Sequence, residues 1–242
     1  MTKFMRIKLE NTLNFAKKTR NQKNIQYIII HYTGMQSARV SLNRLKDLKS
    51  KVSCHYFITR QGEILRMVED NKVAWHAGKS RWKSKQNLNY QSIGIELQNK
   101  GHNLGYEKFS KIQIKSLVDI LRKLKRKYNI KKKNILGHSD IAPLRKKDPG
   151  EKFPWELLSK KGLSIWYSNK REKSNYSNIK NRRDTFFKNL HKIGYRYFKI
   201  NKYSKNDRLI IKAFQMRFLP KKVNGRITDK TLKISHLLAN KS

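Results

Sequence analysis

The sequence predicts an α/β fold, in which a central mixed β-sheet is flanked by helices, followed by a small C-terminal domain of three helices. Three observations lead to this prediction. Short apolar runs rich in β-branched residues recur before residue 140, an amphipathic segment at residues 108–128 has helical spacing, and the pattern after residue 181 is purely helical. Strands that alternate with helices are typical of a sheet covered by helices.

The first strand and the first helix are predicted between residues 25 and 50. Residues 25–33 form an apolar run bounded by Asn24 and Gly34, which is typical of a buried strand. Ser37 is the predicted N-cap of the next helix, because its side chain can accept from a free backbone N–H of the first turn. One side of that helix carries apolar residues at helical spacing: Val40, Leu42, Leu45 and Leu48.

A β-hairpin is predicted next. Residues 52–58 and 63–68 have strand character, and Gly62 between them supplies the turn. Residues 71–76 are predicted as a short extended piece. The polar stretch 78–91 is predicted as a loop.

The second half of the predicted sheet contains two strands and one long helix. Residues 92–98 (SIGIELQ) and 134–137 are predicted as strands, and residues 108–128 as the amphipathic helix between them. The segment 139–155 carries three of the four prolines of the chain and is predicted as a loop.

Changes in composition divide the chain into four regions. Residues 1–23 form a basic N-terminal tail, for which fraying is favoured over a short amphipathic helix. Residues 24–160 hold the predicted α/β domain. Residues 161–180 are polar and rich in Lys, Ser and Asn, as in a linker, and residues 181–242 form the helical domain.

The overall charge is strongly positive. The 242 residues include 58 Lys and Arg against 16 Asp and Glu, which gives a formal net charge of +42. Such an excess favours anionic partners, but the charges are spread along the whole chain, as a general compositional bias would also spread them. No run approaches the roughly 18 apolar residues of a membrane span. A single cysteine, Cys54, excludes an intramolecular disulfide framework.

Glu96 lies inside an apolar strand, between Ile95 and Leu97. A carboxyl group buried there has a desolvation cost unless it faces a cleft, and the raised pKa that burial causes suits general acid–base catalysis. An outward-facing residue on a half-buried strand is the other interpretation.

Two histidines and one aspartate are candidates for a metal site. His31 ends the first strand, His138 ends a later strand, and Asp148 lies in the proline-rich loop that follows. Two imidazoles and a carboxylate match a catalytic zinc site, which leaves a fourth position open for water. Structural histidines at strand ends are the alternative, and the helical HExxH signature is absent.

Five motifs, in order along residues 24–157, resemble the type 2 N-acetylmuramoyl-L-alanine amidase family. This family includes the bacterial AmpD and AmiD enzymes, phage lysozyme-amidases and animal peptidoglycan recognition proteins. The motifs are IIIHYT, VSCHYFITRQGEI, VAWHAG, SIGIEL and ILGHSDIAPLRKKDPGEKFPW. The resemblance implies the type 2 amidase fold and makes residues 24–160 a zinc amidase catalytic domain.

The resemblance also implies roles for individual residues. His31, His138 and Asp148 correspond to the ligands of Zn²⁺. Glu96 corresponds to the catalytic acid of the AmpD and AmiD branch, and Lys146 to the lysine that stabilises the developing oxyanion.

Two further positions are expected at the substrate groove. Trp75 and His76 resemble residues that line it in the family. Cys54 stands where phage and animal members often carry a catalytic tyrosine, which agrees with the branch that uses glutamate.

The C-terminal region resembles a three-helix peptidoglycan-binding domain over residues 181–240. The matching motifs are LHKIGY, IIKAFQMRF and VNGRITDKTL. The match is looser, because the usual VDG is VNG here and the usual glycine after the AFQ helix is absent. A generic helical bundle is the alternative.

The resemblance therefore predicts a zinc-dependent amidase that hydrolyses the bond between N-acetylmuramic acid, or its anhydro form, and L-alanine in wall turnover or recycling. Peptidoglycan or a muropeptide is the expected partner, with no specific nucleic acid and no transmembrane segment, and a monomer is expected. A non-catalytic peptidoglycan-binding protein is the alternative. The lack of a visible signal peptide predicts a cytoplasmic location, and the wall-binding resemblance suggests a periplasmic or outer-membrane-associated one instead.

Overall fold

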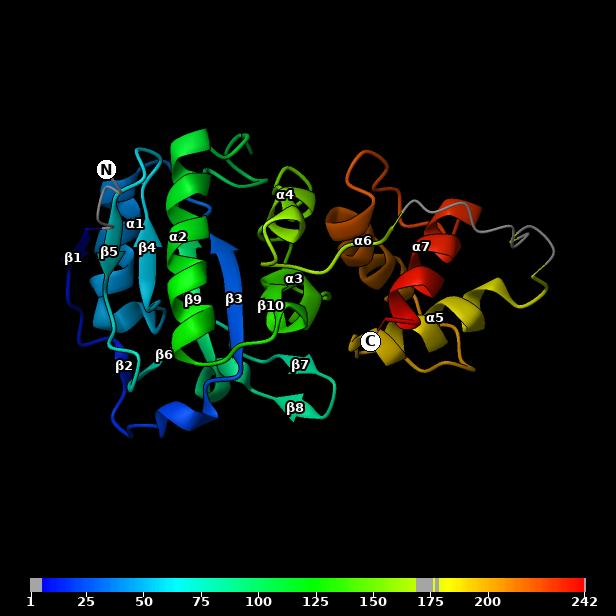
Figure 1. Ribbon diagram of the computed structural model, residues 1–242, viewed down its shortest axis with the longest axis horizontal. Helices are drawn as coiled ribbons and strands as arrows, with labels where there is room; N and C mark the ends of the chain where they lie inside the picture. Colours follow the sequence, from blue (N-terminus) through cyan, green and yellow to red (C-terminus); the bar gives the residue numbers. More distant parts are fainter. Residues whose placement is uncertain (1–5, 169–175, 177–178, 242) are drawn as a thin grey trace.

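The computed structural model describes residues 6–168, 176 and 179–241, and a six-stranded mixed sheet lies at its centre (Figure 1). The strands follow the order β1 (Ile7–Leu9), β5 (Ile64–Arg66), β4 (Tyr56–Ile58), β9 (Ser92–Leu97), β3 (Tyr27–Tyr32) and β10 (Ile135–Gly137). Only the pairing of β4 with β5 is antiparallel in this sheet. The strands β3, β9 and β10 are therefore parallel, and their carboxyl ends meet at one edge of the sheet.

Two small antiparallel pairs, seven α-helices and four short 3₁₀ helices complete the regular structure in the described part of the chain. The pairs are β2 (Phe15–Ala16) with β6 (Val73–Ala74) and β7 (Arg81–Trp82) with β8 (Lys85–Gln86). The helices are α1 (Ala38–Lys46), α2 (Lys111–Lys127), α3 (His138–Ile141), α4 (Trp155–Lys160), α5 (Arg182–Ile193), α6 (Asp207–Phe218) and α7 (Asp229–Ala239).

The alternation of side chains along β9 explains the two faces of the sheet. Ile93, Ile95 and Leu97 belong to the core cluster that also contains the apolar side of α2, which crosses this face in Figure 1. Because successive side chains of a strand point to opposite faces, Ser92, Gly94 and Glu96 lie on the other face. The sequence SIGIEL thus places a polar row on one face, and that face carries the site described below.

The predicted fold class and its main elements are confirmed. The strands at 25–33, 92–98 and 134–137 and the helix at 108–128 correspond to β3, β9, β10 and α2. The hairpin corresponds to β4 and β5, and Gly62 in its turn has a φ of 85°. Ser37 caps α1, because its side chain accepts from the N–H of Val40.

The prediction of a frayed N-terminal tail is wrong for residues 6–23. The strand β1 pairs with the edge of β5, and β2 pairs with β6. Arg20 is buried and donates to the backbone carbonyls of Asp70, Asn89 and Ser92. Strands of two and three residues are too short for a periodic pattern, because the partner strand and not the local sequence stabilises them. Residues 1–5 of the predicted tail lie outside the described residues.

Two predicted loops also contain regular structure. The stretch 78–91 contains the β7–β8 pair, and the stretch 139–155 continues the four-residue helix α3 that begins at His138. Elements this short give no detectable periodicity. Within the predicted linker, residues 169–175 and 177–178 lie outside the described residues.

The three predicted C-terminal helices are confirmed as α5, α6 and α7, beyond β10 in Figure 1. They do not stand apart from the sheet, because one core cluster contains Ile29 of β3 and Leu136 of β10 together with Phe186, Phe214 and Leu232 of the helices. No helix in the described ranges combines the length and the hydrophobicity that crossing a bilayer requires.

Candidate metal centre and active site

The strand register places the candidate side chains at one edge of the sheet. His31 near the end of β3 is paired with Glu96 of β9, and paired residues of parallel strands point to the same face. His138 is the first residue of α3, directly after β10. Asp148 follows in the loop that returns to this edge.

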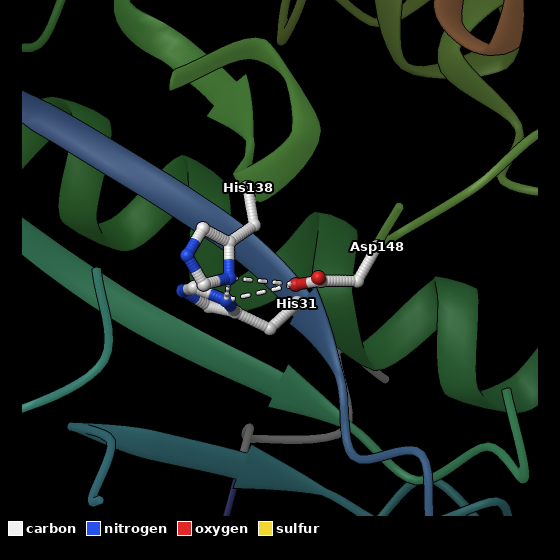
Figure 2. A group of neighbouring side chains, drawn as sticks. All are labelled: His31, His138 and Asp148. Atoms are coloured by element: carbon white, nitrogen blue, oxygen red, sulfur yellow. Dashed lines mark hydrogen bonds and ion pairs between the residues drawn. The ribbon is translucent and has the colours of Figure 1, made fainter. Parts of the chain in front are cut away.

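Three of these side chains converge on one point (Figure 2). The Nδ1 atoms of His31 and His138 are 2.9 Å apart, and Oδ2 of Asp148 lies 3.0 Å from each of them. All three residues are buried. Each residue therefore offers one donor atom to the same small volume, as a metal site requires.

A chain of hydrogen bonds fixes which ring nitrogen of His31 carries the proton. The Ser92 hydroxyl donates to the carbonyl of Leu88 over 2.6 Å, so its oxygen accepts from Nε2–H of His76 over 3.2 Å. Nδ1 of His76 is then an acceptor, and Nε2–H of His31 donates to it over 3.1 Å. The lone pair of His31 Nδ1 consequently faces Asp148.

His138 has the same arrangement. Its Nε2 lies 3.1 Å from the carbonyl oxygen of Ala77, and the tautomer that donates Nε2–H to this carbonyl leaves the lone pair of Nδ1 facing Asp148. In these tautomers two imidazole lone pairs and a carboxylate oxygen face one another. A divalent cation satisfies this donor set, and two nitrogens with one carboxylate oxygen are ligands that zinc accepts.

The protonation states also suit metal binding. Burial, together with the neighbouring His138, lowers the pKa of His31 to about 4, which keeps its imidazole neutral near neutral pH. Burial alone would raise the pKa of Asp148, but its interactions with His138 and His31 outweigh burial and hold that pKa well below the usual range. Neutral imidazole and ionised carboxylate are the forms that coordinate metals.

Glu96 has the opposite character. Burial, followed by the negative charge of Asp148, raises the pKa of Glu96 to about 8, although Lys146 opposes the shift. Its Oε2 atom is buried and has no hydrogen-bond partner among the residues that the structure describes. Glu96 therefore has a carboxyl group whose pKa lies near neutrality and whose oxygen is available to a ligand in the cavity.

The structure brings six of the seven predicted site residues to one cavity of about 390 Å³. They are His31, His76, Glu96, His138, Lys146 and Asp148. Trp75 is not among the residues that line this cavity. It is partly buried, and its backbone N–H donates to the hydroxyl of Ser53.

Sequence reasoning missed Arg145, which also lines the cavity. Its guanidinium donates to the carbonyls of Ala77 and Lys79 and lies 3.3 Å from Nε2 of His138. Arg145 thus holds the segment whose carbonyl orients His138. Its position next to Lys146 in RKKDPG is the one signal in the sequence that could have indicated it.

A second missed group lies at the rim of the cavity. The Tyr32 hydroxyl is 2.8 Å from Nδ1 of His102, and Nε2 of His102 is 3.0 Å from a carboxylate oxygen of Glu151. These two hydrogen bonds connect the segment after β9, which contains His102, to the loop that contains Asp148 and Glu151. Nothing in the sequence indicated it, because the three residues are far apart along the chain.

Replacing Ser92 by alanine is expected to weaken metal binding by about 10-fold, because His76 then loses the partner that fixes its proton on Nε2 and its hydrogen bond to His31 is no longer imposed. Competition with a chelator measures the affinity. Ser80→Ala is the matched control, since Ser80 is similarly buried and its hydroxyl bonds to the backbone of Gly78 and Leu88 instead of to a histidine. Equal affinities of both variants and the unaltered protein would contradict this role of Ser92.

Glu96 is expected to make the stability of the metal-free protein depend on pH. Its pKa is about 8 in the folded state against a usual value of 4.5, so the folded state retains a proton that the unfolded state releases between these values. The stabilisation is complete below pH 4.5 and is lost as the pH rises toward 8, by up to about 1.4 kcal/mol per pH unit.

Denaturant unfolding of metal-free protein at several pH values tests this dependence. Glu96→Gln cannot ionise and should lack this slope, whereas the groups that titrate in both proteins cancel in the difference. Identical pH dependence of the free energy of unfolding in the two proteins would refute the shift.

With this geometry established, known proteins offer a direct comparison. Residues 21–151 match the N-acetylmuramoyl-L-alanine amidase family. The chain is 32% identical to the N-acetylmuramoyl-L-alanine amidase AmiD of Escherichia coli over 232 residues, which span 90% of this chain and 83% of AmiD. It is 43% identical to the 1,6-anhydro-N-acetylmuramyl-L-alanine amidase AmpD of the same organism over 105 residues, 43% of this chain and 55% of AmpD.

Solved structures extend the likeness to nearly the whole chain. AmiD of E. coli, solved with its substrate anhydro-N-acetylmuramic acid-L-Ala-D-γ-Glu-L-Lys, is 31% identical with a TM-score of 0.80, over 93% of this chain and 92% of that one. AmpDh3 of Pseudomonas aeruginosa is 27% identical with a TM-score of 0.82, over 94% and 96%. The C-terminal helices are thus included in the likeness.

Proposed function

The chain belongs to the N-acetylmuramoyl-L-alanine amidase family, and from this premise we propose that it hydrolyses the amide bond between N-acetylmuramic acid and L-alanine with a zinc ion held by His31, His138 and Asp148. The observation that carries the proposal is the convergence of three ligand atoms beside Glu96, whose Oε2 atom has no hydrogen-bond partner in the described part of the chain. A non-catalytic peptidoglycan receptor, the alternative from the sequence, needs no such acid.

The residues of the cavity divide the chemistry between them. His31, His138 and Asp148 would hold the divalent ion, which would lower the pKa of a bound water and polarise the scissile carbonyl group. Glu96 accepts the proton of the attacking water and delivers it to the nitrogen of L-alanine as the C–N bond breaks. Lys146 on the cavity wall places positive charge where the carbonyl oxygen becomes negative.

The proposed substrates are muropeptides and peptidoglycan that carry N-acetylmuramic acid or its anhydro form. The support is the similarity to AmiD, which was solved with an anhydro-muropeptide, and to AmpD, which is named for the anhydro form. The proposal keeps the peptidoglycan-binding role expected for residues 181–242 and the cytoplasmic location, with its periplasmic alternative.

Product analysis tests the proposed function. The purified protein is incubated with anhydro-N-acetylmuramic acid-L-Ala-D-γ-Glu-L-Lys and, separately, with peptidoglycan. Mass spectrometry is expected to find a free peptide with a new amine on L-alanine and an intact sugar, and elemental analysis one zinc ion per chain. Cleavage within the glycan or the peptide, or activity that persists after complete metal removal, would contradict the proposal.

A further inference from the structure

A buried ion pair joins the helix that bears His138 to the C-terminal region. Asp140 of α3 and Arg217 of α6 form this pair, and their side chains are 1% and 2% exposed. Asp140 lies two residues after His138, whereas Arg217 is more than seventy residues away in the chain. The contact therefore links the metal site directly to α6.

The carboxylate of Asp140 receives three donors. Its Oδ2 accepts from the backbone N–H of Gly137 over 2.8 Å and from the guanidinium of Arg217. Its Oδ1 accepts from the hydroxyl of Tyr195, which follows α5. The bond to Gly137 closes the turn at which β10 ends and His138 enters the site, so the orientation of this carboxylate fixes the start of α3.

Arg217 holds the same turn from a second side. It donates to the carbonyl of Ile135 in β10 over 3.1 Å, and to the hydroxyl of Ser164 over 3.3 Å. Its guanidinium also lies 4.2 Å from the centre of the Trp155 ring of α4. The Arg217 side chain thus contacts Ile135, which precedes His138 in the chain, and Asp140, which follows it.

We propose that Arg217 and Tyr195 are positioning residues of the metal site, which act through Asp140 on His138. This inference rests on the proposed function and gives the C-terminal helices a role in hydrolysis that is independent of any binding to the wall. If either donor is removed, the buried carboxylate of Asp140 loses one of its hydrogen bonds. The turn at Gly137 must then move so that water can reach this carboxylate.

The test uses the full chain with two variants, Arg217→Met and Tyr195→Phe. Metal affinity is measured by chelator competition, and ligand geometry by the visible absorption of the cobalt-substituted protein. Arg217→Met is expected to weaken metal binding by about 10- to 100-fold and to change the cobalt spectrum. Tyr195→Phe, which removes one oxygen atom, is expected to do so by several-fold.

Arg183→Met is the matched control. Arg183 of α5 also forms a buried-acid ion pair, with Asp207, but its contacts stay within the C-terminal region. This control is expected to leave the metal affinity and the cobalt spectrum unchanged. A similar loss in Arg183→Met would overturn the inference, because general destabilisation of the helices would then explain all the results.

The remaining outcomes are also decisive. Wild-type metal affinity and an unchanged cobalt spectrum in Arg217→Met and Tyr195→Phe would overturn the inference. If Arg217→Met does not fold, Tyr195→Phe alone decides between the two results. Failure of the unaltered chain to bind any divalent metal is distinguishable, because it would refute the proposed function itself.

Discussion

Glu96→Gln is expected to lower kcat by about 10²- to 10⁴-fold, the usual contribution of general acid–base catalysis, while metal binding remains intact. Glutamine has the shape of glutamate but cannot accept the proton of water or return one to the leaving amine. Because Glu96 is not one of the three converging ligands, its replacement leaves the donor set complete. Initial rates of peptide release and the zinc content of the same preparation measure both effects.

Glu63→Gln is the control for that variant. Glu63 lies in the hairpin between β4 and β5, is exposed and pairs only with Lys8 through its carboxylate, so its loss should not affect turnover. A Glu96→Gln enzyme with a wild-type rate would show that another group moves the proton.

Asp148→Asn is expected to abolish both zinc binding and hydrolysis. The amide is neutral, so it cannot replace the charge of a carboxylate ligand. Without the metal, the transition state loses several kcal/mol of stabilisation, which lowers the rate by about 10³-fold or more. Elemental analysis and peptide release measure the two effects. Full zinc occupancy in this variant would remove Asp148 from the proposed site.

Asp70→Asn provides a control for the loss of a buried carboxylate as such. Asp70 is 8% exposed against 6% for Asp148, and it bonds to Tyr56, Lys127 and Tyr128 away from the cavity. This variant is expected to lose stability but to keep its zinc.

The sequence was sufficient for the elements that are long or strongly patterned. The run of 25–33 predicted β3, and the apolar spacing of 108–128 predicted α2, because burial of one strand or one helix face leaves a periodic trace. The strand β1 and the β7–β8 pair left no such trace, since each of these strands has only two or three residues and is stabilised by its partner strand. The helix α3 also left no periodic pattern, because it has only four residues.

The candidate site was predictable only in part, and for a related reason. The ligand and acid positions followed from the motifs, but the supporting side chains depend on the tertiary fold. Gly94 illustrates this point, because a Cβ atom there would lie 2.3 Å from Cγ of His76. Only the folded sheet shows that the lack of a side chain at Gly94 makes room for the imidazole of His76, which orients His31. The sequence predicted His76 only as a residue of the substrate groove.

The N-terminal segment has a practical consequence for work on fragments of this protein. The strand β1 covers the outer edge of β5, and Arg20 donates to the carbonyls of Asp70, Asn89 and Ser92. A fragment limited to residues 21–151 would present β5 as an open template for strand exchange between molecules. The span that carries the family signature therefore lacks the strand that pairs with this edge, and a fragment that includes β1 is expected to resist such exchange.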